Sequence, residues 1–346
     1  MALPKVAIVV LNYNGWRETV HCLKTLLLTD YPQFTIHVLD NGSQRNELTI
    51  LKRRFNDPRI VFHRIIKNIG YSGGNNYLFN KINEKYIALV NNDVEVPSNW
   101  LKPLVNVLEK DKTIAIVQPK ILWFKNKRYF DYSGACGGYI DIFGYPFTRG
   151  RIFNTIEEDR GQYDKEVDLF WASGATMLMR MSALRKVGGF DERFFNYMEE
   201  IDLCFRLHRA GYRVVFTPKS YVYHKVAATL SRKPMKKRFW EHRNNILMII
   251  KNYPLGKLLL ILPIRILLEY LSFIYYLGSQ QFDYALAVIY SQISLLYMGP
   301  LFFIQRLSKS VKETSKMKKI IYSKSIVIDY YLFKKRNYHS LEWREN

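Results

Sequence analysis

The chain has 346 residues and a formal net charge of +22, and 48% of its residues are hydrophobic. This length and apolar content exclude a disordered tail and predict one large domain with an appendage. The positive charge predicts phosphate-rich partners, meaning nucleic acid, anionic lipid or phosphorylated substrate, although a generally basic solvated surface is the simpler interpretation. The three cysteines, Cys22, Cys136 and Cys204, are too widely spaced for a disulfide framework or a zinc site, which favours a reducing compartment.

The first hundred residues alternate between strand-like and helix-like patterns. A strand-like run at 6–11 follows Met1–Lys5 directly, so we expect no signal peptide. Apolar residues at helical spacing over 16–28 predict a helix, and further strand-like runs lie at 34–39, 60–63 and 86–90. Strands that alternate with helices predict a doubly wound α/β sheet, mostly parallel, with helices on its faces.

Each predicted strand is followed by a small polar turn. Because the carboxyl ends of parallel strands meet at one edge of a sheet, we expect these turns to surround a single crevice and bind a nucleotide sugar there. Each turn taken alone would be ordinary turn chemistry. The glycine-rich turn at 68–76 fits neither a P-loop nor a dinucleotide fingerprint. The candidate residues are Asn12, Tyr13, Asn14, Asp40, Gly42, Ser43, Asn68, Gly70, Gly73, Asn75, Asn92 and Asp93.

Asp93 lies just past the buried run at 86–90. A diphosphate leaving group carries concentrated negative charge, which a Mg²⁺ or Mn²⁺ ion held by a carboxylate would stabilise. We therefore expect Asp93 to face the diphosphate of a nucleotide sugar through a divalent cation.

The pattern is irregular over 125–160, and loops of this length usually carry function or are mobile. Acidic residues then gather at Glu199 and Glu200, near a predicted helix start. Transfer of a sugar to a hydroxyl needs a carboxylate base, for which Glu200 is our first candidate and Glu199 our second. The alternatives are stabilisation of the helix by its first-turn acids and pairing of Asp202 with Arg206.

His224 follows a strand-like run and precedes a basic segment, 232–238. A single histidine is more often structural, but His224 is a candidate metal ligand or diphosphate contact. The basic segment is either a solvated loop or a clamp on phosphate, and the apolar residues downstream favour a role at a membrane surface.

Two long apolar runs follow, at 258–277 and 284–305. The second is long enough to span a bilayer, and the first is interrupted by Pro263, Arg265 and Glu269. Basic flanks on both outer sides predict a hairpin with both ends in the cytoplasm. A pair of helices lying in the membrane plane and a buried helical core stay open as alternatives. We thus expect a catalytic domain at 1–245, apolar helices at 246–310 and a basic tail at 311–346.

Several motifs together resemble a known family. They are VAIVVLNYNGW, VLDNGS, NIGYSGGNN, LVNNDVEVP and the long run from WASGATMLMRM to VVFTP, and they cover roughly residues 6–245. The sequence resembles a family 2 glycosyltransferase of the GT-A fold, most like the rhamnosyltransferase-like members that build cell-surface polysaccharides. The fold that this implies is a Rossmann-like, mostly parallel sheet flanked by helices, with a C-terminal apolar helical region that associates with a membrane.

The resemblance also implies roles for individual residues. Asn12 and Tyr13 would shape the nucleoside pocket, and Asp40 would contact the base. Asp93 would be the final aspartate of the DXD-like metal motif, in which Asn91 stands where many members have a carboxylate. Glu199-Glu200 stands where the family usually has Glu-Asp. The residues that would line the acceptor side are Ser173, Gly174, Ala175, Gly189, Phe190 and Asp191.

We therefore expect an inverting, metal-dependent glycosyltransferase at the cytoplasmic face of an anionic membrane. Its donor would be a UDP-, dTDP- or GDP-linked sugar and its acceptor a lipid-linked or cell-surface glycan. The alternatives are a polyprenyl-phosphate glycosyltransferase and a catalytically silent glycan-binding or scaffold subunit. We do not expect nucleic acid as a partner, because the basic segments lie beside apolar ones.

Overall fold

The structure is a computed structural model that describes residues 3–225, 234–307 and 311–343. A nine-stranded central sheet has the order β11-β13-β6-β12-β4-β1-β2-β3, and β5 pairs with β13. Its strands are β1 Val6–Asn12, β2 Phe34–Asn41, β3 Ile60–Ile65, β4 Tyr86–Val90, β5 Val94–Glu95, β6 Ile114–Trp123, β11 Val167–Leu169, β12 Thr176–Arg180 and β13 Arg213–His224.

The predicted α/β fold is confirmed, with one difference in the sheet. β1 runs parallel to β2 and β4, β2 runs parallel to β3, and β6 runs parallel to β13. β12 is antiparallel to both of its neighbours, β4 and β6. The sheet is therefore mixed in its second half, which the alternating pattern of the first hundred residues does not predict.

Hydrophobic cores lie on both faces of this sheet. Along β1, Val6, Ile8 and Val10 belong to one core and Ala7 and Val9 to the other, as the two-residue period of a strand requires. The first core includes residues of α1, α2 and α4, and the second includes residues of α3, α5, α6 and α7. These helices are α1 Trp16–Leu26, α2 Glu47–Arg54, α3 Gly70–Phe79, α4 Leu101–Lys110, α5 Met181–Val187, α6 Glu199–Arg209 and α7 Pro234–Asn252.

The irregular region at 125–160 forms a second, smaller sheet. Its strands are β7 Gly138–Asp141, β8 Pro146–Thr148, β9 Arg151–Ile152, β10 Thr155–Ile156 and, from the far end of the chain, β14 Ile321–Tyr322. β14 pairs in parallel with β7, and Ile326 N donates to Asp141 Oδ2 over 3.0 Å. Two short helices, α10 Ser315–Lys319 and α11 Ile326–Tyr331, flank β14. The structure thus differs from the expected basic tail, because its apolar residues Met317, Tyr322 and Leu341 are buried.

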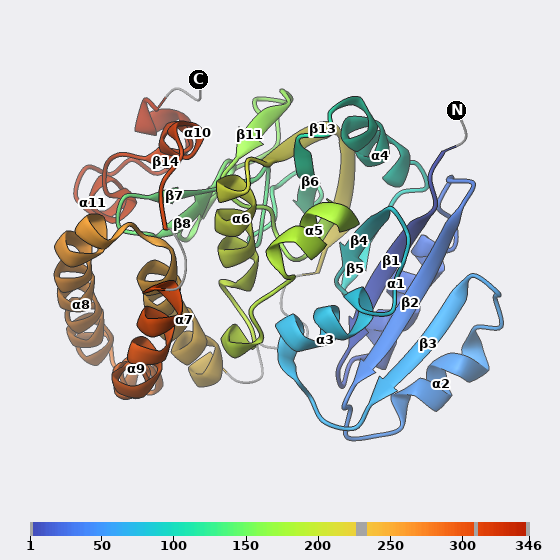
Figure 1. Ribbon diagram of the computed structural model, residues 1–346, viewed down its shortest axis with the longest axis horizontal. Helices are drawn as coiled ribbons and strands as arrows, with labels where there is room; N and C mark the ends of the chain where they lie inside the picture. The colour runs from blue at the N-terminus through green and yellow to red at the C-terminus, as the bar shows by residue number, and fades with distance from the viewer. Residues whose placement is uncertain (1–2, 226–233, 308–310, 344–346) are drawn as a thin grey trace.

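The helices α7, α8 Leu255–Gly278 and α9 Phe282–Leu307 lie side by side at the end of the molecule opposite β3 and α2 (Figure 1). Both α8 and α9 are long and apolar enough to cross a membrane. The expected boundary at 245 falls inside α7, which contributes Ile246 and Ile249 to the core that also contains residues of α3, α5 and α6.

The charged residues of α8 point toward the protein. Arg265 and Glu269 are 1% and 2% exposed, and they pair with each other over 3.0 Å. Arg265 Nη2 also donates to Asn245 Oδ1 over 2.7 Å, and Glu269 pairs with His242. Both of these partners belong to α7, so the middle of α8 packs against a helix of the catalytic domain.

We expect Tyr322→Ala to lower the free energy of unfolding by about 3 to 5 kcal/mol, the usual cost of deleting a buried aromatic ring. Tyr322 is 1% exposed and donates to Asp329 Oδ2 over 2.6 Å. Phe333 of the same segment is 63% exposed, so Phe333→Ala should change stability by about 0.5 kcal/mol or less. Melting temperatures in detergent test this difference. Equal temperatures for the two variants would show that the C-terminal segment does not belong to the core.

Candidate active site

The polar turns after β1 and β2 form one hydrogen-bonded network. In the register of the sheet, Asn12 lies beside Asp40. Glu47, at the start of α2, accepts from Asn12 Nδ2 over 2.9 Å and from Gly15 N over 3.0 Å. Ser43 Oγ accepts from Asn12 Nδ2 over 3.3 Å. The sequence analysis did not single out Glu47. The only feature of the sequence that points to this residue is an acidic side chain four residues after Ser43.

Two further residues of these turns were predicted from the sequence. Asn14 N donates to Ser43 Oγ over 3.0 Å, and Asn14 Oδ1 accepts from Gln44 N over 2.9 Å, so Asn14 joins the two turns. Tyr13, between Asn12 and Asn14, is half-buried.

Asp40 is fully buried, and one of its oxygens is left for a ligand. Oδ1 accepts from Ser43 N over 3.2 Å, while Oδ2 accepts no hydrogen bond from the described residues. The nearest cation is the Nε atom of Arg64, 3.8 Å from Oδ2. A buried acceptor without a hydrogen bond is unusual in a folded protein. Asp40 Oδ2 is therefore suited to accept an N–H of a bound molecule.

Glycines bring the turns after β2 and β3 together and join α3 to a later turn. Gly42 has a φ of +75°, and a Cβ there would lie 2.4 Å from Asn68 N. Asn68 Oδ1 accepts from Gly70 N over 2.8 Å. Gly70 has a φ of +77°, and its Cβ would lie 2.4 Å from Phe195 O. Only glycine avoids both the left-handed strain and these contacts.

The other predicted residues of the glycine-rich turn make contacts within α3. Asn75 Nδ2 donates to Tyr71 O over 2.9 Å, and a Cβ on Gly73 would lie 3.1 Å from Ile69. Tyr71 N donates to Asn196 Oδ1 over 2.8 Å. The start of α3 is therefore fastened to the turn that precedes α6.

Asp93 and His224 meet at the end of the sheet, where β5 pairs with the last residues of β13. His224 Nε2 lies 3.2 Å from Asp93 Oδ1, and His224 Nδ1 lies 3.0 Å from Asp131 Oδ1. Burial alone would lower the pKa of His224, but the two carboxylates raise it to about 10. Asp131 comes from the irregular region, and the sequence analysis did not single it out.

The structure brings the two predicted metal ligands, Asp93 and His224, together. Among the described residues, no group of three or more His, Cys, Asp or Glu side chains could hold a metal ion. Asp93 suits a cation that takes its remaining ligands from a diphosphate and water, because Mg²⁺ is commonly held by one or two carboxylates. His224 would join it as a ligand only after it loses a proton. Asp131 supplies the partner that a metal-ligating histidine usually has on its second nitrogen.

Asn92 lies next to Asp93 but is directed into the protein. Its Nδ2 donates to Thr19 Oγ1 over 3.1 Å and to Gly15 O over 3.4 Å. Asn92 thus fastens the end of β4 to the start of α1 and has a structural contact where the sequence predicted a ligand contact.

The acidic pair Glu199 and Glu200 begins α6, and neither Oε2 has a hydrogen-bond partner among the described residues. Burial raises the pKa of Glu199, and the neighbouring Glu200 raises it further. Burial also raises the pKa of Glu200, to about 7. A carboxyl group with a pKa near neutrality can both take up and release a proton.

The turn before this pair is held in an unusual conformation. Phe195, Tyr197 and Met198 all have positive φ values, between 65° and 70°. Asn244 of α7 donates to the carbonyls of Phe194, Asn196 and Tyr197 over 2.7 to 3.0 Å. α7 therefore holds the turn that positions the acidic pair.

The predicted acceptor segment 173–175 connects the two halves of the site. Tyr71 Oη donates to Gly174 O over 2.6 Å, and Asn91 N donates to Ala175 O over 2.9 Å. Ser173 N donates to Gln118 Oε1 over 2.7 Å. Burial raises the pKa of Tyr71, and Glu199 and Glu200 raise it further. Tyr71 thus lies near the acidic pair and contacts the segment that leads to Asp93.

The second predicted acceptor segment, Gly189 to Asp191, is occupied by internal contacts. Phe190 packs on Tyr71 with ring centroids 5.9 Å apart, and a Cβ on Gly189 would lie 2.7 Å from Asn76 Oδ1. Asp191 Oδ2 pairs with Arg193 over 2.5 Å and with Lys251 over 2.7 Å. Despite burial, these cations hold the pKa of Asp191 below its usual range.

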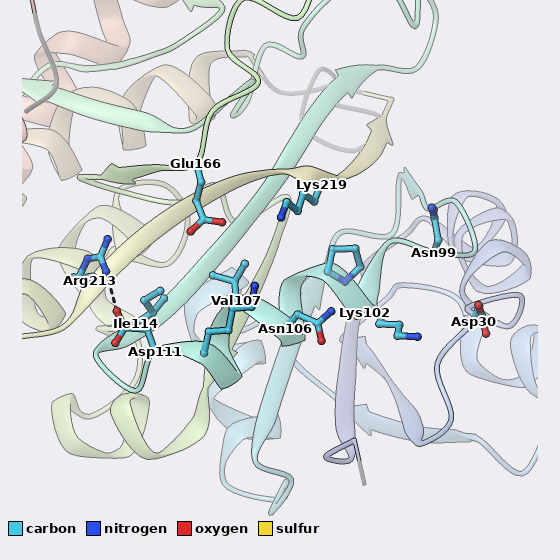
Figure 2. A pocket seen from close by; sticks show the side chains of 12 residues that line it. Asp30, Asn99, Lys102, Asn106, Val107, Asp111, Ile114, Glu166, Arg213 and Lys219 are labelled. Atoms are coloured by element: carbon cyan, nitrogen blue, oxygen red, sulfur yellow. Dashed lines mark hydrogen bonds and ion pairs between the residues drawn. The ribbon is translucent and has the colours of Figure 1, made fainter. Parts of the chain in front are cut away.

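A cavity of about 510 Å³ lies away from this site, between α4 and the starts of β6 and β13 (Figure 2). Ile114 and Arg213 line it at the opposite ends of these strands from His224. Arg213 Nη1 pairs with Asp111 Oδ2 over 2.8 Å across the opening. The cavity shares no residue with the candidate active site.

The fold is a GT-A fold, with a polar network after β1 and β2 and a carboxylate pair at the start of α6. The model of the family described as glycosyl transferase family 2 matches residues 7–188. The chain belongs to this family and is a glycosyltransferase.

Its curated relatives include rhamnosyltransferases. It is 25% identical to N-acetylglucosaminyl-diphospho-decaprenol L-rhamnosyltransferase of Mycobacterium tuberculosis, over 71% of this chain and 83% of the relative. It is 30% identical to rhamnosyltransferase WbbL of Escherichia coli, over 45% of this chain and 60% of the relative. It is 27% identical to O-antigen biosynthesis protein RfbC of Myxococcus xanthus over 65% of this chain, and the match spans only 18% of RfbC.

Solved structures confirm the fold. One is the mannosyltransferase PcManGT from Pyrobaculum calidifontis, solved with GDP-Man and Mn²⁺, with a TM-score of 0.54 and 13% sequence identity. The match covers 89% of this chain and 79% of the PcManGT chain. GalNAc-T7, solved with UDP, GalNAc and Mn²⁺, has a TM-score of 0.53 and 16% identity over 64% of this chain and 43% of its own.

We expect Gly70→Ala to lower the melting temperature by several degrees and sugar transfer at least tenfold, because the new methyl group pushes the Phe195 turn and the acids beside it. Gly188→Ala is the matched control, since Gly188 has a φ of +86° with nothing within 4 Å of an added Cβ. Gly188→Ala should lower the free energy of unfolding by only about 1 kcal/mol, which is the strain of a positive φ at a residue other than glycine. Melting curves and transfer assays of both variants test this, and equal losses would argue against the Gly70 contact.

Proposed function

We propose that this glycosyltransferase moves a sugar from a nucleotide-diphospho-sugar to a hydroxyl of a lipid-linked or cell-surface glycan, with inversion at the anomeric carbon. The observation that carries the proposal is the acidic pair of a buried Glu199 and a half-buried Glu200, both with raised pKa values, next to Tyr71, which contacts the segment that leads to Asp93 through Gly174. A base and a diphosphate site on one sheet edge are what a single displacement requires.

Glu200 is the base in this proposal. The acceptor oxygen attacks the anomeric carbon, its proton passes to a Glu200 carboxylate oxygen, and the bond from the anomeric carbon to the diphosphate oxygen breaks. The electron pair of that bond leaves with the nucleoside diphosphate. Because one displacement takes place, the configuration inverts. The charge of Glu200 in turn raises the pKa of the neighbouring Glu199.

Asp93 and His224 would hold the divalent cation, and Asp131 would orient His224. A bound Mg²⁺ or Mn²⁺ neutralises the charge that develops on a departing diphosphate. The two carboxylates beside His224 raise its pKa, and a divalent cation would compensate the negative charge that Asp93 and Asp131 bring together. The solved structures of PcManGT and GalNAc-T7 contain Mn²⁺, which supports this assignment.

The nucleoside would lie against the network after β1 and β2. Asp40 Oδ2, buried and without a hydrogen bond from the described residues, would accept an N–H of the base. Uracil, thymine and guanine each offer a ring N–H, so a UDP-, dTDP- or GDP-linked sugar fits this acceptor. Asn12 and Ser43 hold the turn around the ribose.

We propose that the acceptor is carried by a lipid and that the enzyme lies on the cytoplasmic face of an anionic membrane. The relative from Mycobacterium tuberculosis is named for a diphospho-decaprenol substrate. The exposed side chains of α8 and α9 include Leu260, Ile274 and Leu296, at 61% to 78% exposure. Because Arg265 and Glu269 pack against α7, these helices fit the membrane plane better than a spanning hairpin.

We expect Glu200→Gln to lower the transfer rate by about 10²- to 10⁴-fold, the usual contribution of a general base. Because the base must be ionised, wild-type activity should rise with pH as pH passes the Glu200 pKa of about 7. Glu192→Gln, an exposed acid just before the turn, should keep both the rate and the pH profile. If Glu199→Gln lost activity while Glu200→Gln kept it, the base would be Glu199.

We expect Mn²⁺ with one of UDP, dTDP or GDP to raise the melting temperature, because a ligand that binds only the native state stabilises it by mass action. Asp93→Asn should abolish the Mn²⁺-dependent part of this shift. Asp30→Asn is the control, since Asp30 lines the distant cavity. No shift with any of the three nucleotides would contradict the donor site, provided that the wild-type protein melts cooperatively.

A further inference from the structure

A second cavity, of about 300 Å³, lies where α5, α6, α7 and α9 meet. Its lining includes five basic side chains, and no Asp or Glu among the described residues lines it. We call it the basic cavity. Its basic residues are Lys186, Arg206, Arg209, Lys251 and Arg306.

Internal carboxylates compensate only part of this charge. Arg206 pairs with Asp202 over 2.8 Å, and Lys251 pairs with Asp191 and Asp202 over 2.7 and 2.9 Å. The other three basic residues have no ion pair with a carboxylate within the described ranges. The cavity therefore carries excess positive charge on Lys186, Arg209 and Arg306.

Capping of the C-terminus of α7 accounts for some of the hydrogen-bond donors in the basic cavity, but not for all of them. Arg306 donates to Ile250 O and Tyr253 O over 2.8 and 2.6 Å, and Arg209 Nη1 donates to Asn252 Oδ1 over 2.8 Å. Cations at the C-terminus of α7 are favoured by its dipole. Nε of Arg209 is buried and has no partner in the described part of the chain. Burial lowers the pKa of Arg209 to about 10, which reflects incomplete compensation of its charge.

The basic cavity opens beside the apolar surface of α9. Gln305 and Arg306 line the cavity, and the neighbouring side chains Leu301 and Ile304 are 57% and 63% exposed. Leu301 lies one helical turn before Gln305, on the same side of the helix. A phosphate in the cavity would thus have apolar surface next to it for an attached acyl or prenyl chain.

We propose that the basic cavity binds a phosphate group, which the adjacent apolar surface indicates is the headgroup phosphate of a membrane lipid. Guanidinium and ammonium donors form their strongest hydrogen bonds with such oxyanions. The site shares no residue with the Asp93 and Glu200 sites, so it does not depend on the transfer mechanism.

The test compares vesicle binding of charge variants. The probes are phosphatidylcholine vesicles with and without phosphatidic acid, and vesicles with oleate as an anion that lacks phosphate. We expect Lys186→Gln with Arg209→Gln to weaken binding to the phosphatidic acid vesicles about 25-fold, at about fivefold per charge. Lys186 is exposed, so Lys186→Gln alone should fold normally and lose about fivefold.

Lys102→Gln with Lys110→Gln is the matched control, because it removes the same charge from exposed residues of α4, far from α9 in Figure 1. It should change vesicle binding less than twofold. Equal losses in the two double variants, or an equal loss on oleate vesicles, would overturn the proposal.

Inorganic phosphate distinguishes the two sources of the group. A rise in melting temperature with inorganic phosphate that the Lys186→Gln variant loses, without any effect on vesicle binding, would support a phosphate site that is filled from solution. Variant-dependent binding to phosphatidic acid vesicles, with no effect of inorganic phosphate, would assign the site to a lipid.

Discussion

The turn from Phe195 to Met198 is the constraint on which the site depends. Three non-glycine residues with positive φ are unfavourable together, at about 1 to 2 kcal/mol each. Such a turn persists only where its surroundings hold it. Here α3 contacts it through Gly70 and the Tyr71–Asn196 hydrogen bond, and α7 holds its carbonyls through Asn244. The orientation of Glu199 and Glu200 is therefore a property of three packed elements and not of α6 alone.

The same α7 helix connects the active site to the apolar helices. Its residues Asn244 and Asn245 are neighbours in sequence, yet Asn244 holds the turn before α6 while Asn245 accepts a hydrogen bond from Arg265 of α8. Near its end, Lys251 bridges Asp191 and Asp202. A division of the chain at residue 245 would cut through these contacts.

Local patterns in the sequence were enough to predict the first half of the fold. Strand alternation gave β1 to β4, and the parallel register then placed Asn12, Asp40 and Asp93 at one edge. The antiparallel direction of β12 could not be predicted, because a local pattern does not encode the direction in which a strand runs. The small sheet closed by β14 could not be predicted, because its strands have only two to four residues and β7 and β14 lie far apart in sequence. Asp131 and Asn244 were missed for the same reason, since their roles come only from contacts with His224 and the turn.

The acids of α6 show why environment decides which carboxylate can serve as a base. Asp202 is buried, as Glu199 is, yet Arg206 and Lys251 overcome the effect of burial and lower its pKa. Glu199 and Glu200 lie three and two residues earlier, no cation among the described residues forms an ion pair with them, and burial raises their pKa values. When the surroundings shift the pKa values of nearby carboxyl groups in opposite directions, the groups have different roles. The acid with the lowered pKa is structural, and the acid with the raised pKa can exchange a proton. Asp202 pairs with Lys251 and so fastens α6 to α7, which is why we propose the pair at the helix start, and not Asp202, for proton transfer.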